Sequence, residues 1–150
     1  MHVVLLAPEI PQNTGSIGRL CLAADTTLHL VEPLGFSLDD KHVRRAGLDY
    51  WPHVRLRVHR DWEAFLAERP PGRLLCFAAR APRRYTEVRY RADDVLVFGC
   101  ESRGLPPAVR DAHREATYGI PLASPQVRSL NLATAVGVVL FEARRQLEGW

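Results

Sequence analysis

Two segments of this 150-residue sequence combine polar side chains with glycine in patterns that could bind a ligand. PEIPQNTGSIGR (8–19) carries Asn13 and Arg19, and FGCESRGL (98–105) carries Glu101 between two glycines. An arginine suits a phosphate, and a glycine lets the backbone approach a ligand closely or turn with a positive φ. Neither segment has the glycine spacing of a dinucleotide fingerprint or a P-loop, so ordinary nicotinamide and nucleoside-triphosphate chemistry lose their main support.

A third segment, IPLASPQVRSLNLA (120–133), places two prolines and several small residues ahead of a long apolar helix. Its irregular backbone could line a pocket with unpaired amide and carbonyl groups. In the alternative interpretation, Ser129 or Asn131 only caps the helix. Through residues 132–143 only Thr134 and Glu142 are polar, and this pattern predicts a helix that is buried on all sides.

Strand-like and helix-like runs alternate along the chain. The predicted strands are 2–7, 27–32, 54–58, 73–79, 95–99 and 118–122, and the predicted helices are 14–25, 37–47, 60–69, 107–115 and 129–146. This alternation predicts an α/β fold, a mostly parallel sheet with helices on both faces. The strict alternation of VRLRV (54–58) indicates an edge strand, whereas VVLLA and VLVF indicate central strands.

Two helix starts carry capping signals. Asn13 or Thr14 could cap the first helix, and Ser37 with Asp40 resembles a capping box for the second. The three ligand-binding segments each follow a predicted strand. Because ligands of open α/β sheets sit beyond the carboxyl ends of the strands, these loops should decide the function.

Composition sets the broad class. Hydrophobic residues make up 47% and charged residues 25% of the chain, which suits one globular domain over residues 1–150. No apolar run approaches a signal peptide or a membrane span, so we expect a cytoplasmic protein without a membrane partner. Three widely spaced cysteines fit neither a disulfide framework nor a zinc site, so we expect reduced thiols and no metal.

The charge pattern gives a weaker signal. The formal net charge of +3 argues only mildly for a polyanionic partner. RAPRRYTEVRYR (80–91) interleaves five arginines with two tyrosines, which is chemistry suited to phosphates and stacked bases. A solvated arginine-rich loop explains the same segment equally well.

The three segments together resemble the three motifs of the SPOUT superfamily of ribose 2'-O-methyltransferases. The matching residues are the Asn13-to-Arg19 spacing, FGxExRGL, and IPL followed by SLNLAxAVGVVLFEA, in that order. VEPLGF (31–36) and RRAGLDYW (44–51) narrow the resemblance to the TrmL-like group, which acts on the ribose of the wobble nucleotide of tRNA, either a cytidine or a modified uridine. The resemblance covers nearly the whole chain. Cys100, where proline is common, and Phe141, where tyrosine is common, depart from the usual pattern.

The resemblance implies a fold and partners that periodicity alone does not give. The carboxyl-terminal third would form a deep trefoil knot, and the knot would form much of a homodimer interface around the apolar final helix. The RNA partner would be the anticodon stem-loop of a tRNA. Arg44 and Arg45 offer RNA contacts, although only one of two adjacent helical arginines can face the RNA. Tyr50 and Trp51 fit core or dimer packing better than base stacking.

The resemblance also implies a cofactor site. S-adenosylmethionine would bind in the knot loops, and the residues implied to hold it are Phe77, Gly99, Ile120, Ser129 and Leu130. The residues implied to act on the ribose are Asn13, Arg19, Glu101 and Asn131. An arginine base is hard to accept because guanidinium stays protonated, so we interpret Arg19 as a clamp on the neighbouring phosphate.

Each of these assignments has a simpler alternative. Arg19 could be a surface arginine paired with Asp25 or Glu9. Glu101 could merely bind loop amides, and Asn131 could merely cap a helix. At the level of the whole protein, the alternative is a non-catalytic RNA-binding dimer with the same fold.

Overall fold

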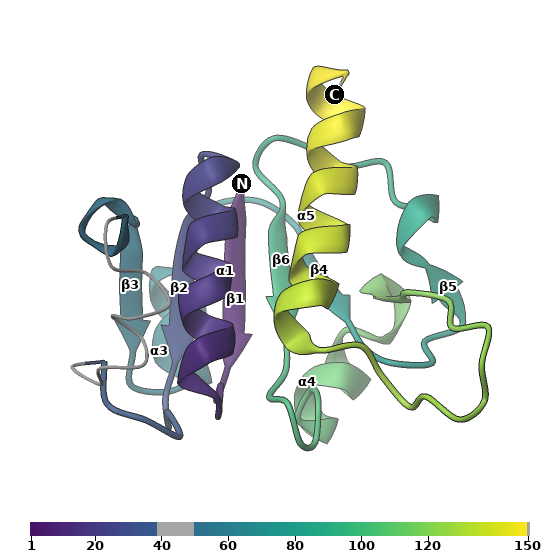
Figure 1. The fold of residues 1–150 in the computed structure, drawn as a ribbon, viewed down its shortest axis with the longest axis horizontal. Helices are drawn as coiled ribbons and strands as arrows, with labels where there is room; N and C mark the ends of the chain where they lie inside the picture. The colour runs from purple at the N-terminus through teal and green to yellow at the C-terminus, as the bar shows by residue number, and fades with distance from the viewer. Residues whose placement is uncertain (39–49, 150) are drawn as a thin grey trace.

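The computed structural model describes residues 1–38 and 50–149, which form one seven-stranded sheet covered by helices (Figure 1). The strand order is β3-β2-β1-β6-β4-β7-β5, and every neighbouring pair is parallel. The strands are β1 (His2–Leu6), β2 (Thr27–Val31), β3 (Leu56–His59), β4 (Leu74–Phe77), β5 (Arg83–Arg84), β6 (Val95–Phe98) and β7 (Thr117–Gly119).

Alternate residues of the central strands enter two apolar layers. Val3 and Leu5 of β1 pack in the layer beneath α1 (Pro11–Ala23) and α5 (Leu132–Glu148). Val4 and Leu6 pack on the other face, where α3 (Trp62–Glu68) and α4 (Pro107–Ala112) lie. Figure 1 shows α1 and α5 side by side over the same face of the sheet. The predicted parallel sheet with helices on both faces is therefore confirmed.

Strand positions also agree with the sequence patterns. β3 forms one edge of the sheet, and β6 lies at its centre beside β1, as predicted. All four residues of β6 are buried, as expected for a strand covered on both faces. The two-residue edge strand β5 lies in the arginine-rich segment and has no counterpart among the predicted strands.

Several predicted boundaries are wrong. The first helix begins at Pro11, which suits a first helical position, and follows Ile10 as the N-cap. Asn13 and Thr14 lie inside the helix, and their amides donate to the Ile10 carbonyl at 3.1 and 3.2 Å, so neither is its cap.

Later elements also differ from prediction. The predicted helix 107–115 is α4 followed by a separate 3-10 turn (Arg114–Ala116), and the strand predicted over 118–122 ends at Gly119. Two further short 3-10 turns are formed by Trp51–His53 and Tyr85–Glu87. The predicted helix 37–47 and its capping box lie largely outside the described residues.

The final helix is apolar, but it is covered on one side only. Leu132, Val136, Val139, Leu140 and Ala143 are buried. Thr134 is exposed and Phe141 is 39% exposed, so the expectation that this helix is buried on all sides is wrong for the single chain. Part of the apolar surface of this helix, at Phe141 and Leu147, is therefore open in the single chain.

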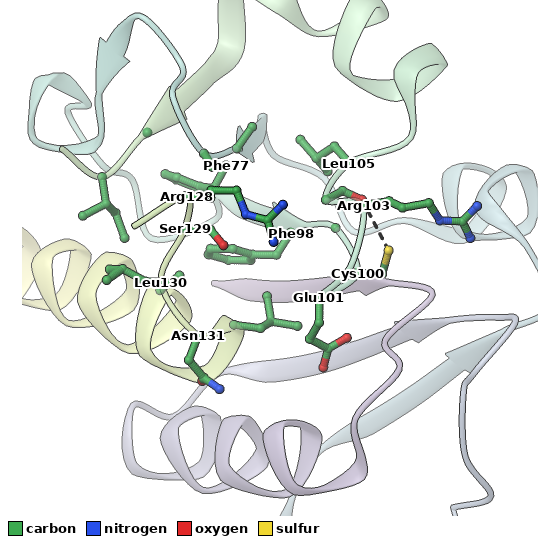
Figure 2. Close-up of a pocket in the computed structure, with 18 of the residues that line it drawn as sticks. Phe77, Phe98, Cys100, Glu101, Arg103, Leu105, Arg128, Ser129, Leu130 and Asn131 are labelled. Carbon is green, nitrogen blue, oxygen red and sulfur yellow. Dashed lines mark hydrogen bonds between the residues drawn. The ribbon is translucent and has the colours of Figure 1, made fainter. Parts of the chain in front are cut away.

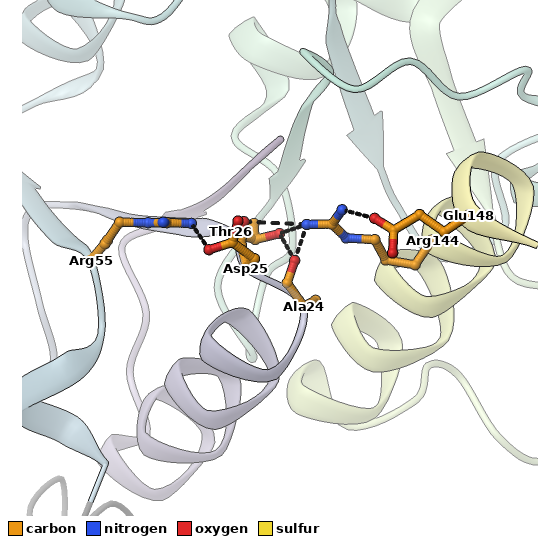
Figure 3. A network of polar contacts seen from close by, with 6 residues as sticks. All are labelled: Ala24, Asp25, Thr26, Arg55, Arg144 and Glu148. Carbon is orange, nitrogen blue, oxygen red and sulfur yellow. Dashed lines mark hydrogen bonds and ion pairs between the residues drawn. The ribbon is translucent and has the colours of Figure 1, made fainter. Parts of the chain in front are cut away.

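Arg144 ties the end of this helix to the end of α1 (Figure 3). Its guanidinium donates to the carbonyls of Ala24 and Asp25, the latter at 3.2 Å, and lies 3.5 Å from the Thr26 hydroxyl. It also forms an ion pair with Glu148, one turn further along α5. Because carbonyls at a helix end lack partners within the helix, a cation there stabilises α1 as well as joining it to α5.

Three histidines form a second polar feature, across the first three strands at the sheet edge. His2 Nδ1 lies 3.1 Å from His29 Nε2, and His29 Nδ1 lies 3.0 Å from His59 Nε2. We call this set the histidine chain. Burial lowers the pKa of His29 from 6.5 to about 3 and the pKa of His2 to about 4, because a charged ring there would lack water. The histidine chain is therefore neutral at pH 7.

The three cysteines are free and buried. Burial raises the pKa of both Cys21 and Cys76 to about 12, so these thiols are unreactive at neutral pH. Among the described residues, no helix is both long and apolar enough to cross a membrane. The trefoil knot and the single-domain extent stay predictions.

Candidate active site

A pocket of about 720 Å³ opens at the carboxyl ends of β4, β6 and β7 (Figure 2). Its lining comes from all three segments that the sequence singled out. Eight of the nine predicted site residues line it: Asn13, Phe77, Gly99, Glu101, Ile120, Ser129, Leu130 and Asn131. Arg19 is not among the lining residues.

The second segment turns sharply at the end of β6, and glycine makes the turn possible. A Cβ on Gly99 would come within 1.9 Å of the Gly104 carbonyl carbon, so no other residue fits at position 99. Gly104 has a φ of +69°, and its amide donates to the Cys100 carbonyl at 2.9 Å. Gly99 therefore allows a close approach between two parts of the same chain, its own backbone and that of Gly104.

Two glutamates, Glu9 and Glu101, join the first segment (8–19) to the second (98–105) through hydrogen bonds in both directions. Glu101 accepts the amide of Glu9 at 2.7 Å and the amide of Ile10 at 3.2 Å. In return, Glu9 accepts the amide of Ser102 at 2.9 Å and its hydroxyl at 2.7 Å. The Ser102 hydroxyl, and then its amide, lower the pKa of Glu9 below its ordinary value. Ile10, the N-cap of α1, has no capping side chain, and the Glu101 carboxylate that accepts its amide places a negative charge at the positive end of this helix.

Two asparagines extend this set of hydrogen bonds to the third segment (120–133). Asn13 Nδ2 donates to Glu101 Oε1 at 2.9 Å, and Asn131 Nδ2 donates to Asn13 Oδ1 at 2.9 Å. Asn131 Oδ1 accepts the amides of Ala133 and Thr134, at 2.9 and 3.3 Å, and so caps α5. We call Asn131, Asn13 and Glu101 the amide relay. The hydrogen bonds of the simpler interpretations of Glu101 and Asn131 are thus present, and both residues also line the pocket.

The pocket floor is apolar and aromatic. The rings of Phe77 and Phe98 stack with centroids 5.0 Å apart and planes 18° apart. Ile120, Leu122 and Leu130 add aliphatic surface to the lining. Among the described residues, no backbone acceptor pairs with the amides of 128–130. The third segment therefore offers free donors beside an apolar floor, as its sequence suggested.

Arg19 lies elsewhere on the molecule. It is exposed on α1, six residues after Asn13, which corresponds to about 9 Å along the helix axis. Its Cζ atom lies 4.4 Å from the ring centroid of Tyr50. The carboxylates of the simpler interpretation are engaged by other groups, Asp25 by Arg55 at 2.7 Å and Glu9 by Ser102. The structure therefore separates Arg19 from the amide relay of its own chain.

Sequence reasoning missed three arginines that line the pocket, Arg103, Arg110 and Arg128. Figure 2 shows Arg128 extending across the pocket and Arg103 pointing outward. Both belong to segments that the sequence singles out, Arg103 two residues after Glu101 and Arg128 directly before Ser129. Arg110 forms an ion pair with Asp111 at 3.4 Å, so Arg103 and Arg128 are the two lining arginines that give the pocket positive charge beside Glu101.

The structure places the other residues considered for RNA contact in different environments. In the arginine-rich segment, Tyr90 is 6% exposed and its hydroxyl donates to the Tyr85 carbonyl at 3.0 Å, so it cannot serve as a stacking platform. Arg83 lies with its Cζ 4.7 Å from the Tyr118 ring centroid. Tyr50 and Trp51 pack against the core as expected. Arg44 and Arg45 lie outside the described residues.

Comparison with known proteins places this geometry in a family. The profile of the SpoU rRNA Methylase family matches residues 1–141. A tRNA (cytidine(34)-2'-O)-methyltransferase of Burkholderia pseudomallei (strain 1106a) is 50% identical over 148 residues, which cover 97% of this chain and 94% of the relative. The enzyme of that name from Escherichia coli (strain K12) is 45% identical over 148 residues, which cover 98% of this chain and 94% of the relative.

Solved structures agree. One that is described as giving structural insights into the 2-OH methylation of C/U34 on tRNA superposes with a TM-score of 0.94 at 51% identity, over 99% of this chain and 97% of that chain. An AdoMet-bound rRNA methyltransferase from Sinorhizobium meliloti superposes with a TM-score of 0.86 at 28% identity, over 97% of this chain and 56% of that one. With these matches across nearly its full length, the chain belongs to the SpoU methylase family.

Proposed function

We propose that this protein transfers a methyl group from S-adenosylmethionine to the ribose 2'-hydroxyl of nucleotide 34, the wobble nucleotide of a tRNA. The names of relatives at 45 to 50% identity support this reaction. The observation that carries it is the joining of all three sequence motifs in one pocket by the amide relay. A tRNA substrate also agrees with the expected cytoplasmic location.

The pocket residues fit the methyl donor. A volume of about 720 Å³ lies within the range of about 300–1,000 Å³ that small-molecule sites occupy. Phe77, Ile120 and Leu130 offer an apolar bed, and the free amides beside Ser129 could read the edge of a purine. When bound, S-adenosylmethionine supplies an activated methyl on a positively charged sulfur.

Water exclusion is the first contribution of the chain itself. A sulfonium loses its charge as the methyl leaves, so a dry apolar surface favours the transition state over the charged ground state. Ile120, Leu122 and Leu130 provide that surface. Replacing any of them with a polar residue should slow transfer more than it weakens donor binding.

The amide relay orients the acceptor. Both oxygens of Glu101 already accept hydrogen bonds from Glu9, Ile10 and Asn13, so this carboxylate acts as an anchor and not as a general base. Asn13 and Asn131 each use one N–H of the side-chain amide within the relay, which leaves the second N–H of each for the ribose. Fixed donors of this kind align the hydroxyl by proximity.

Arg19 supplies the positive charge, and it does so from a second copy of the chain. A guanidinium stays protonated in proteins, so Arg19 binds the phosphate next to the target ribose, and that phosphate accepts the proton that the 2'-hydroxyl loses. Arg19 does not line its own pocket, which is the reason for assigning it to the pocket of a homodimer partner. Exposed apolar residues on the same layer, Leu22 at 37% and Phe141 at 39%, support a dimer packed through α1 and α5.

The test is transfer of tritium from labelled S-adenosylmethionine to bulk tRNA, followed by nucleoside mapping of position 34. Arg19→Ala should abolish transfer and leave the donor Kd nearly unchanged, because Arg19 lies outside the pocket. Arg60→Ala, which removes an exposed arginine beside β3, is the matched control and should transfer at the wild-type rate. Donor binding without any transfer by the wild type would support the non-catalytic RNA-binding dimer instead.

A further inference from the structure

The guanidinium of Arg19 rests on an aromatic ring. Its Cζ atom lies 4.4 Å from the centroid of Tyr50, within the distance of about 6 Å for a cation–π contact. Arg19 is exposed on α1, whereas Tyr50 is half-buried and packs against the core. The exposed cation is therefore supported by a ring that the fold holds in place.

The position of the ring follows from the turn that begins at Tyr50. The amide of His53 donates to the Tyr50 carbonyl at 2.9 Å and closes the 3-10 turn Trp51–His53, in which Pro52 restricts the backbone. Trp51 packs directly on α1, since a Cβ added to Gly18 would come within 2.5 Å of its ring. Gly18 immediately precedes Arg19, so the turn and the arginine belong to one packed unit.

Contact through a ring face has a different consequence from an ion pair. A carboxylate partner would occupy the N–H donors of Arg19 and neutralise its charge. A ring beneath Cζ offers no carboxylate oxygen, so this contact leaves the charge of Arg19 uncompensated and its N–H groups available for a bidentate bond with a phosphate. The two carboxylates considered for Arg19, Asp25 and Glu9, are instead engaged by Arg55 and Ser102.

We propose that Tyr50 is a positioning residue that holds the Arg19 guanidinium in the orientation that binds an RNA phosphate. This inference rests on the proposed function, because it assumes that Arg19 contacts the RNA. Tyr50 itself acts through Arg19 and does not contact the reacting atoms. The aromatic ring carries the effect, and the phenol hydroxyl is not needed.

Two variants separate the ring from the hydroxyl. Tyr50→Phe retains the ring and should keep kcat/KM for tRNA methylation within about twofold of wild type. Tyr50→Leu removes the ring and should lower kcat/KM about 5- to 30-fold, the range that corresponds to a cation–π contact. The donor Kd, measured by calorimetry, should stay unchanged in both. Trp62→Leu removes a half-buried ring from α3 on the opposite face of the sheet, and it controls for a general loss of packing.

A double-mutant cycle with Arg19→Ala then tests the route of the effect. The cycle is read as the Kd for an anticodon stem-loop RNA, which stays measurable when turnover is lost. If Tyr50 acts through Arg19, Tyr50→Leu weakens RNA binding in the wild-type background and has no further effect in Arg19→Ala. An equal loss in both backgrounds, or a Tyr50→Leu enzyme with wild-type kinetics, would overturn the inference. A wild-type protein that binds donor and RNA without transfer would instead refute the proposed function, and the cycle would still report on Tyr50.

Discussion

Replacing Glu101 with glutamine should loosen the whole site while changing the shape of the side chain very little. Glu101 Oε1 accepts Ile10 N at 3.2 Å and Asn13 Nδ2 at 2.9 Å, and Oε2 accepts Glu9 N at 2.7 Å. Glutamine has one acceptor oxygen. Its best orientation keeps the first two bonds without their charge assistance and turns an NH2 group toward the Glu9 amide, which is also a donor.

The magnitude follows from these contacts. Loss of one hydrogen bond to a charged acceptor costs about 1.5–3 kcal/mol, and the lost charge at the start of α1 adds about 0.3–1 kcal/mol. Because Glu101 is half-exposed, we expect about 2 kcal/mol in the free energy of unfolding, or a Tm about 4–8 °C lower. Reversing the Asn13 amide cannot compensate, since its oxygen accepts Asn131 Nδ2.

Urea unfolding at one fixed protein concentration measures the effect, because the stability of the proposed dimer would depend on concentration. Calorimetry on the same samples should show weaker donor binding, since Asn131 and the pocket wall depend on the relay. Glu63→Gln, at an exposed position on α3, is the matched control. If Glu101→Gln unfolds at the same urea concentration as Glu63→Gln and binds donor equally well, the carboxylate does not hold the loops together.

Three further predictions concern the loop, the helix clamp and pH. Gly99→Ala should abolish donor binding, measured by calorimetry, because the added Cβ would lie 1.9 Å from a backbone atom. Gly104→Ala has space for its Cβ but keeps a φ of +69°, so it should lower the free energy of unfolding in urea by only about 1 kcal/mol. Arg144→Met should destabilise the protein by about 1.5–3 kcal/mol, as urea unfolding measures it. Arg145→Met, which removes a more exposed guanidinium paired with a glutamate, should cost clearly less, and equal losses would contradict the role of Arg144 in joining α1 to α5. Burial lowers the pKa values of the histidine chain in the folded state, so the unfolded chain binds more protons below pH 6.5, and the free energy of unfolding should fall as pH drops from 6.5 toward 4. A flat profile over that range would refute this reasoning.

The sequence predicted the residues of the pocket better than it predicted their contacts. A glycine-rich turn after a buried strand is a local feature, so the sequence alone indicates the segment of Gly99 and Glu101, and the family resemblance supplies their roles. The bond from Glu101 to Asn13 spans 88 residues, and no periodicity reports such a contact. Asn13 was expected to cap α1 because its residue type favours caps. Pro11 instead starts the helix earlier, and this shift turns Asn13 inward to the relay.

The final helix shows another limit of sequence patterns. Hydrophobicity around all its sides predicted complete burial, but in the single chain Phe141 remains 39% exposed. A residue pattern records that a surface avoids water without recording whether its own chain or a second copy covers it. The same limit applies to Arg19, whose motif pointed to the site although its position on α1 lies outside the pocket of its own chain.

The most direct test of this account is a crystal structure with S-adenosylhomocysteine, the demethylated product. We expect the nucleoside to lie on the floor formed by Phe77 and Leu130, against the free amides of 128–130, with Arg19 of a second copy facing the open side of the pocket. Product bound elsewhere on the chain, with this pocket filled only by solvent, would contradict the central claim.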